Sequence, residues 1–285
     1  MIGKKLKIFL IILIGLILIS FLATIMESSL SYGKIAMVNV KGIIVDSKAV
    51  IEEIKQYRKN PAIKAIVLRV DSPGGAVVPS QEIYEEIKRT IKVKPVVVSM
   101  GSIAASGAYY ISCPATKIIA NPGTITGSIG VLIEIPNIKG LLDKIGVKAE
   151  VIKSGKYKDI TSPLKPPLQS DEKEVLQRLI DDVHDQFVDA VSEGRKIPIE
   201  KVKKIADGRV FTGLKAKEIG LVDEIGDLEY AIKVAAQLGN IKGEPEIIMK
   251  KTTILYELLK GDTESLIKRL LPTSQIYYLY LPQTN

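Results

Sequence analysis

The 285-residue sequence contains one cysteine, one histidine and no tryptophan. With Cys113 alone, the chain forms no internal disulfide and no cysteine-based metal cluster. A serine–histidine catalytic site would have to use His184. Only four phenylalanines are available to stack on bases, and the basic residues behind the net charge of +8 are interleaved with 32 acidic residues. Because nucleic-acid binding relies on a clustered basic surface, the composition argues against a nucleic-acid partner.

Charge is also missing from residues 8–26, which are mostly isoleucine and leucine. A run of this length can cross a bilayer as a helix. A signal peptide cleaved after Ser31 is the alternative, but the apolar region of a signal peptide is usually shorter. Because Lys4, Lys5 and Lys7 precede the run, we expect a single-pass cell-membrane anchor with a cytoplasmic N-terminus and an extracytoplasmic body.

The composition divides the chain into three regions. Residues 1–33 comprise the cytoplasmic stub, the anchor and a short linker. From 34 to 240, β-branched runs alternate with amphipathic stretches, which predicts an α/β domain with a parallel sheet and crossover helices. Residues 241–285 are apolar but aperiodic, so their role stays unassigned. The middle region is long enough to bury a core of its own.

The pattern predicts the individual elements as follows. Strands are expected at 35–42, 62–72, 94–100 and 148–155. Helices are expected at 49–60, 78–91, 137–146 and 170–194, with three more between 198 and 239. Two turns rich in small residues, DSPGGAV at 71–77 and GSIAASG at 101–107, follow strands. Because functional groups collect at the carboxyl ends of parallel strands, these turns are the candidate site.

Three serines lie in or beside the second turn: Ser99, Ser102 and Ser106. The small residues around them have two ordinary uses. One is close packing of a helix against the sheet. The other is to place a nucleophilic serine where backbone N–H groups stabilise a developing oxyanion. Spacing alone leaves both uses open.

A nucleophilic serine needs a base. His184 is a poor candidate, because we expect it in the middle of a helix among aspartates and far from any turn. A lysine can serve where burial keeps it neutral. Lys153, Lys156 and Lys158 lie in a loop that follows an expected strand, and spacing alone does not choose among them.

Five motifs occur in a fixed order behind the apolar run: DSPGG (71–75), GSIAASGAYYIS (101–112), TGSIGV (126–131), SGKYKD (154–159) and ADGRVFTGLKAKEIGLVDEIG (206–226). Together they resemble the signal peptide peptidase A family in its short, single-domain bacterial and archaeal form. The resemblance covers about residues 35–236. It implies a fold of the Clp protease and crotonase type and a serine–lysine peptidase that needs no metal or cofactor.

The resemblance also assigns roles to single residues. Ser106 corresponds to the nucleophile and Lys158 to the general base. Ser128 corresponds to the residue that orients the lysine amine. Gly75 and Gly107 correspond to the positions whose backbone N–H groups form the oxyanion hole. We expect Ser106 to sit on a surface turn.

Two further expectations concern the surroundings of this site. Because a lysine base must be neutral, burial should disfavour its ammonium form, and Asp159 should point away from Lys158. The family usually has a glycine where this chain has Ala108, whose methyl either narrows the pocket or tightens the packing. Tyr109 and Tyr110 suit an interface or a buried core.

The function implied by the resemblance is a membrane-anchored endopeptidase acting on apolar peptides such as signal peptide remnants. The family forms ring-like homo-oligomers in which neighbouring copies contribute to the site. Two alternatives stay open. One is a membrane peptidase of the stomatin-associated type, with the same dyad and a specific protein substrate. The other is a non-catalytic membrane-tethered scaffold in which the turns serve only packing.

Overall fold

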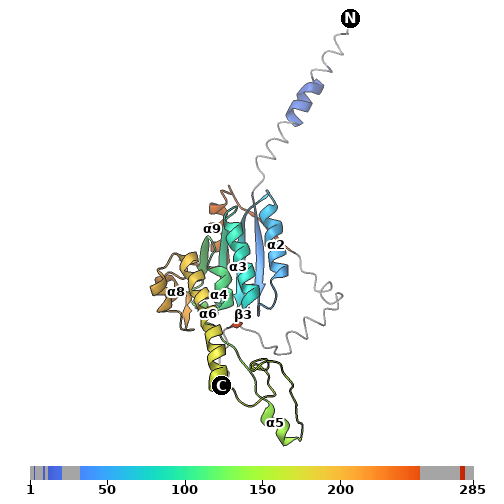
Figure 1. Ribbon diagram of the computed structural model, residues 1–285. Coiled ribbons are helices and arrows are strands. Elements are labelled where there is room, and N and C mark those ends of the chain that lie inside the picture. Colours follow the sequence, from blue (N-terminus) through green and yellow to red (C-terminus); the bar gives the residue numbers. More distant parts are fainter. Residues whose placement is uncertain (1–2, 4–8, 10–11, 21–32, 251–276, 280–285) are drawn as a thin grey trace.

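The computed structural model describes residues 3, 9, 12–20, 33–250 and 277–279 (Figure 1). Residues 12–20 are helical. None of the helices in these described ranges is long and apolar enough to cross a membrane. Much of the span expected at residues 8–26 lies outside the described residues.

The described part of the chain is built on an eight-stranded sheet with the order β7-β6-β4-β2-β1-β9, in which β5 also pairs with β4 and β8. All of its pairs are parallel except β6–β7, which is antiparallel. The strands of this sheet are β1 (Lys34–Lys41), β2 (Ile63–Ser72), β4 (Val96–Ala105), β5 (Lys117–Ala120), β6 (Ile125–Gly127), β7 (Val210–Thr212), β8 (Glu224–Ile225) and β9 (Glu246–Met249). A separate two-stranded sheet pairs β3 (Gly74–Ala76) with β10 (Tyr277–Leu279).

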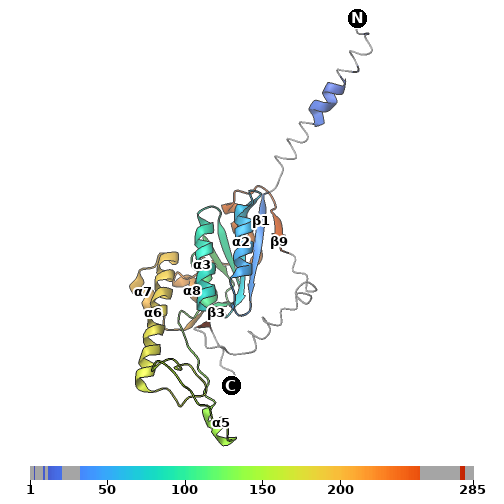
Figure 2. The same ribbon diagram turned by 45° about the vertical axis from the view of Figure 1, so that its right-hand side comes forward.

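Helices cover both faces of the large sheet. In Figures 1 and 2, α2 and α3 lie against one face and α9 lies on the other. The helices are α2 (Lys48–Lys59), α3 (Val77–Ile91), α4 (Gly107–Ser112), α5 (Lys139–Lys144), α6 (Ser170–Arg195), α7 (Ile199–Lys203), α8 (Gly213–Glu218) and α9 (Leu228–Leu238). This arrangement explains why the central strands are apolar on both faces.

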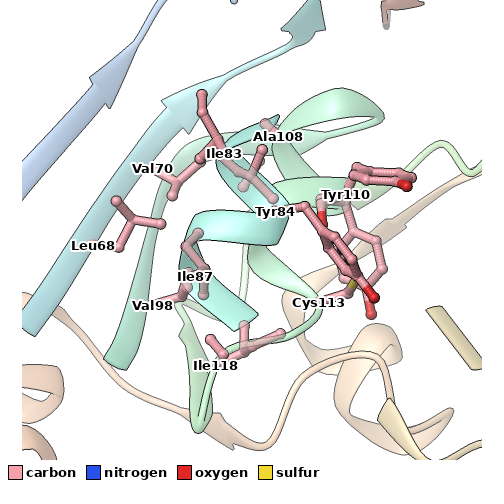
Figure 3. Packing of buried hydrophobic residues seen from close by; sticks show 14 of the residues in the cluster. Leu68, Val70, Ile83, Tyr84, Ile87, Val98, Ala108, Tyr110, Cys113 and Ile118 are labelled. Atoms are coloured by element: carbon pink, nitrogen blue, oxygen red, sulfur yellow. Dashed lines mark hydrogen bonds between the residues drawn. The ribbon is translucent and has the colours of Figure 1, made fainter. Parts of the chain in front are cut away.

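The two core clusters follow from the alternation of side chains along each strand. On β2, Ile66 and Leu68 belong to the larger cluster, whereas Val67 between them packs with α9 on the other face. Figure 3 shows the larger cluster, in which Ile83 of α3 lies close to β2 and β4. Burying each such aliphatic side chain stabilises the fold by about 1.5–3 kcal/mol.

Most expected elements are confirmed. The mixed α/β class with a mostly parallel sheet is present, and β1, β2 and β4 lie at the expected positions. The three helices expected between 198 and 239 are α7, α8 and α9. Tyr109 and Tyr110 are buried in the core. Beyond residue 240, β9 pairs in parallel with β1 and extends the sheet.

Two expectations about local structure are wrong. Residues 148–155 form no strand, because no described strand lies beside them to complete hydrogen bonds, and Ile152 is 96% exposed. The turn expected at 101–107 is mostly strand, since β4 runs to Ala105 and only Ser106 separates it from α4.

A long segment, residues 132–169, connects the region after β6 to α6, and we call it the arm. The arm includes α5 and extends away from the sheet at the end where β3 lies (Figures 1 and 2). None of its residues is buried. Several are large and apolar, including Leu141, Ile145 and Ile152, which are 62%, 64% and 96% exposed.

Candidate active site

Ser106 occupies the sharp turn between β4 and α4. Its backbone has φ 55° and ψ −121°, a conformation that costs a non-glycine residue about 1–3 kcal/mol. Two backbone bonds hold it. The N–H of Ser106 donates to the carbonyl of Gly127 at 2.8 Å, and the carbonyl of Ser106 accepts from the N–H of Tyr110 at 2.8 Å. The surrounding structure therefore fixes a strained serine at the carboxyl end of a central strand.

The expected surface position of Ser106 is wrong, because this residue is only 1% exposed. The cause lies in its neighbours. Ala105 ends a central strand, and Gly107 and Ala108 open a helix whose residues are all buried. The other two serines differ from it. Ser99 is buried and accepts a hydrogen bond from Arg69, whereas Ser102 is exposed.

Ser128 lies immediately beside this turn. It follows Gly127, whose carbonyl accepts the bond from Ser106, so the β4–β6 pairing brings the two serines to one edge. Ser128 has a φ of 50° and is 7% exposed. Its N–H donates to the carbonyl of Arg209 at 2.8 Å. Ser128 therefore lies at the end of the strand that pairs with the end of β4 carrying Ser106.

The two glycines of DSPGG are required for different physical reasons. Gly74 has a φ of +105°, which favours glycine. Gly75 lies against Ile44, so that a Cβ atom would stand 2.0 Å from the Ile44 carbonyl oxygen. The carbonyl of Gly74 and the N–H of Ala76 both bond Ile44. Because polar groups alternate along a strand, the N–H of Gly75 faces the opposite edge of β3.

That opposite edge of β3 is paired with β10. The pairing is antiparallel and places Tyr277 opposite Ala76, Tyr278 opposite Gly75 and Leu279 opposite Gly74. The edge of the DSPGG segment thus accepts an extended peptide backbone. Here the segment that fills it comes from the end of the same chain.

The candidate lysines all lie on the arm. Lys153 pairs with Asp159, as expected if Asp159 does not face Lys158. Lys156 pairs with Asp171, and the hydrogen bond that its ammonium donates to that carboxylate raises the pKa of Lys156. Lys158 is exposed, in a turn closed by its own N–H, and within residues 33–250 its amine forms no ion pair and no hydrogen bond. The described chain therefore does not bring Lys158 into contact with Ser106.

A cavity of about 490 Å³ is lined by Ser128, by other residues of the TGSIGV and ADGRV motifs, and by residues of α6 that the sequence analysis did not place at the site. His184 of α6 is among them, although it was expected far from any turn. Asp207 lies at the same cavity, and hydrogen bonds from Arg209 lower its pKa to about 2. Its carboxylate is therefore charged at neutral pH. Ser128 and α6 are far apart in the sequence, so the sequence did not indicate that His184 lies at the same cavity as Ser128.

Two other residues can be assigned to the interior. Ala108 is fully buried and packs in the core close to Ile83 (Figure 3), so its methyl tightens packing and does not narrow a pocket. Cys113 is also fully buried, and burial raises the pKa of its thiol. A reactive thiolate requires the opposite environment, which excludes Cys113 as the nucleophile.

Comparisons with known proteins agree with this geometry. The profile of Peptidase family S49 matches residues 88–242, and that of Clp protease matches residues 30–124. A Synechocystis sp. protein that carries a provisional protease name is 45% identical over 238 residues, which cover 81% of this chain and 84% of that protein. The chloroplastic serine protease SPPA of Arabidopsis thaliana is 35% identical over 230 residues, 79% of this chain and 34% of that protein. Protease 4 of Haemophilus influenzae is 36% identical over 259 residues, 82% of this chain and 42% of that protein.

The chain spans 84% of the Synechocystis relative, 34% of the Arabidopsis protein and 42% of the Haemophilus protein. The mostly parallel α/β fold agrees with the match to Clp protease. The Peptidase family S49 profile spans more than half of the chain. The chain therefore belongs to peptidase family S49 and is a serine peptidase.

Proposed function

We propose that the protein is a membrane-anchored endopeptidase in which Ser106 and Lys158 form the catalytic dyad and apolar peptides, such as cleaved signal peptides, are the substrates. One observation carries the proposal. Ser106 is held in a strained conformation between a central strand and a helix, beside a glycine edge that accepts an extended backbone. Backbone strain of this kind is concentrated at functional sites.

The chemistry follows from the groups at this edge. Oγ of Ser106 attacks the carbonyl carbon of the scissile peptide bond, and Nζ of Lys158 accepts the hydroxyl proton. The backbone N–H groups of Gly75 and Gly107 stabilise the negative charge on the carbonyl oxygen. Lys158 then gives the proton to the leaving amine as the C–N bond breaks. The same lysine next takes a proton from a water molecule that attacks the acyl-serine, and it returns that proton to Oγ of Ser106 as the ester bond breaks.

The pairing of β10 with β3 supports peptide binding as an added strand. Main-chain hydrogen bonds along a sheet edge bind any extended peptide and leave selection to the side-chain pockets. Such binding suits unfolded chains better than folded proteins, whose backbone is already paired. The provisional name of an Enterococcus faecium relative, 38% identical over 221 residues, includes signal peptide peptidase.

The position of Lys158 supports a homo-oligomer. A neutral lysine requires burial, whereas the arm that carries Lys158 has no buried residue in a single chain. The arm also exposes large apolar residues such as Leu141 and Ile152. We infer that the arm of one copy packs against the next copy and places Lys158 beside Ser106 and Ser128 there. This packing would bury Lys158 and would supply the contact with Ser106 that a single chain does not make.

The membrane anchor rests on the sequence. Residues 8–26 contain no charge, and three lysines precede them. This arrangement favours a single-pass helix with a cytoplasmic N-terminus and a peptidase domain on the external side. Addition of protease to spheroplasts checks this topology. Digestion of the domain from about residue 28 onward supports it, and protection of the domain would reverse the orientation.

Labelling with a fluorophosphonate that reacts with activated serines tests the nucleophile. The parental protein should label and cleave a fluorogenic peptide, whereas Ser106→Ala should do neither and lose more than about 10³-fold in rate. Ser102→Ala, which changes an exposed serine of the same turn region, is the matched control and should behave as the parent. A folded Ser106→Ala protein that cleaves at the parental rate would assign catalysis elsewhere.

A further inference from the structure

β4 contains a bulge shortly before Ser106. Along the β2–β4 pair, Val70 lies opposite Met100 and Ser72 lies opposite Ala104. Over this stretch β2 advances by two residues while β4 advances by four. Before the bulge β4 pairs with β5, and after it with β6. Bulges redirect a strand and often stand next to active sites. This bulge therefore determines where β4 ends, and with it the position of Ser106.

Two side chains of β2 bind the bulge from one side. Arg69 donates to the carbonyl of Met100 at 3.0 Å. Oδ1 of Asp71 accepts from the N–H of Ile103 at 3.2 Å. The first bond is made where the bulge begins and the second where it ends. The Met100 carbonyl and the Ile103 N–H, one at each end of the bulge, are thus bonded by side chains.

Two threonines bind the bulge from the opposite side. Oγ1 of Thr124 donates to the carbonyl of Gly101 at 2.8 Å, and Oγ1 of Thr126 donates to the carbonyl of Ala104 at 2.7 Å. Both threonine side chains are buried. The bulge is therefore held on both flanks in one defined shape.

Asp71 differs from Arg69 and the two threonines because it connects the DSPGG segment to the strand that carries Ser106. It begins the DSPGG motif, four residues before Gly75, whereas Ile103 stands three residues before Ser106. The absence of a side chain at Gly101 makes this contact possible, since a Cβ atom there would lie 2.7 Å from Cγ of Asp71. One hydrogen bond thus ties the strand leading to the Gly75 N–H to the strand leading to the nucleophile.

We propose that Asp71 is a positioning residue of the peptidase, which fixes the bulge of β4 so that Oγ of Ser106 and the N–H of Gly75 face the same carbonyl group. This inference rests on the proposed roles of Ser106 and Gly75. Asp71 does not touch the reacting atoms. It acts by accepting the Ile103 N–H, so an uncharged acceptor of the same size should replace it.

The test compares Asp71→Ala with Asp71→Asn in the full-length protein, with kcat calculated per serine that labels with the fluorophosphonate. Asp71→Ala should lower kcat about 10- to 100-fold and change KM less than about twofold, because small misplacements of reacting groups cost rates of this order. Asp71→Asn should recover most of the loss, since its amide oxygen accepts the same bond. A role in stability alone would reduce the number of labelled sites and leave kcat per site unchanged.

Gly101→Ala is a second way to break the hydrogen bond between Asp71 and Ile103, because the added methyl must displace the Asp71 carboxyl group. Its matched control is Gly123→Ala, where no atom lies within 4 Å of the added methyl. Gly101→Ala should lower kcat and Gly123→Ala should not, which keeps the test valid if Asp71→Ala does not fold. The parental kcat in Asp71→Ala or Gly101→Ala, or an Asp71→Asn protein no better than Asp71→Ala, would overturn the inference. Activity in Ser106→Ala would instead overturn the proposed function.

Discussion

The N–H of Ser106 and the carbonyl of Gly127 form a hydrogen bond of 2.8 Å between the two serine-bearing turns. Both turns depart from ordinary backbone geometry, with φ values of 55° at Ser106, 81° at Gly127 and 50° at Ser128. These three residues lie on two adjacent strand ends that this hydrogen bond joins. The bond makes the position of Ser106 depend on the TGS segment as well as on its own strand.

Gly127→Ala should therefore damage the site. The added methyl would lie 2.6 Å from Cδ2 of Phe211, in a backbone conformation that alanine rarely adopts. We expect a loss of about 1–3 kcal/mol in the free energy of unfolding and a fall in kcat of at least tenfold. Gly42→Ala is the control, because Gly42 has a similar φ of +68° but nothing within 4 Å of the added methyl. Chemical denaturation and peptide cleavage of both variants measure the difference. Equal activity in the two would show that the Phe211 contact does not matter.

The C-terminal strand offers a second prediction. The Gly75 N–H lies on the edge of β3 that is paired with β10. A peptide that binds along this edge must therefore displace β10. Deleting residues 277–285 should lower KM for a fluorogenic peptide about 2- to 10-fold with little change in kcat, since only a few backbone hydrogen bonds are exchanged. The control is deletion of residues 280–285, which retains β10. Identical KM values for the two truncated proteins would contradict the prediction.

The regions predicted well from sequence are those whose buried faces show directly in the pattern of apolar residues. The strands at β1, β2 and β4 are apolar on both faces, and α2 presents one apolar stripe, so their type and place follow from periodicity. Residues 148–155 have a similar β-branched composition but no strand beside them. Local composition contains no information about a missing partner, and the strand prediction failed for that reason.

The candidate site shows the same limit. Sequence motifs drew attention to Ser106, Ser128 and Gly75, and the β4–β6 pairing brings the two serines to one edge of the sheet. Gly75 lies in β3, just after the end of β2, where Ser72 pairs with Ala104 of β4. The burial of Ser106, the bulge before it and the cavity beside His184 depend on contacts between distant segments. The pairing of β10 with β3 joins segments about 200 residues apart. At such a separation the entropy of closing the loop hardly distinguishes one pairing register from another, so the sequence does not predict the register.

A third prediction concerns the shared site. If the arm of one copy supplies Lys158 to the next, Ser106→Ala and Lys158→Ala chains should complement each other when they assemble together. In a random mixture about one quarter of the junctions join an intact serine to an intact lysine, so about one quarter of the parental activity should return. Each variant assembled alone is the control and should be inactive. A mixed assembly with no activity would place both residues of the dyad in one chain.

The fourth prediction separates Lys158 from the other candidate bases. Lys153 and Lys156 are held by Asp159 and Asp171, whereas Lys158 has no such partner in the described part of the chain. Lys158→Ala and Lys158→Arg should each lose about 10²–10⁴-fold in kcat, since a guanidinium does not deprotonate in this pH range. Lys153→Ala and Lys156→Ala should keep most of the parental rate.

The dependence on pH distinguishes Lys158 from His184, which lines the cavity beside Ser128. A lysine base accepts the Ser106 proton only in its neutral form, so the rate should rise with pH and stay high under alkaline conditions. If His184 were the base, its replacement would abolish the activity that the lysine is proposed to support. We expect His184→Ala to retain activity and the alkaline profile, as measured by initial rates of peptide cleavage from neutral to alkaline pH. A rate that does not rise with pH, together with an inactive His184→Ala protein, would assign the base to His184.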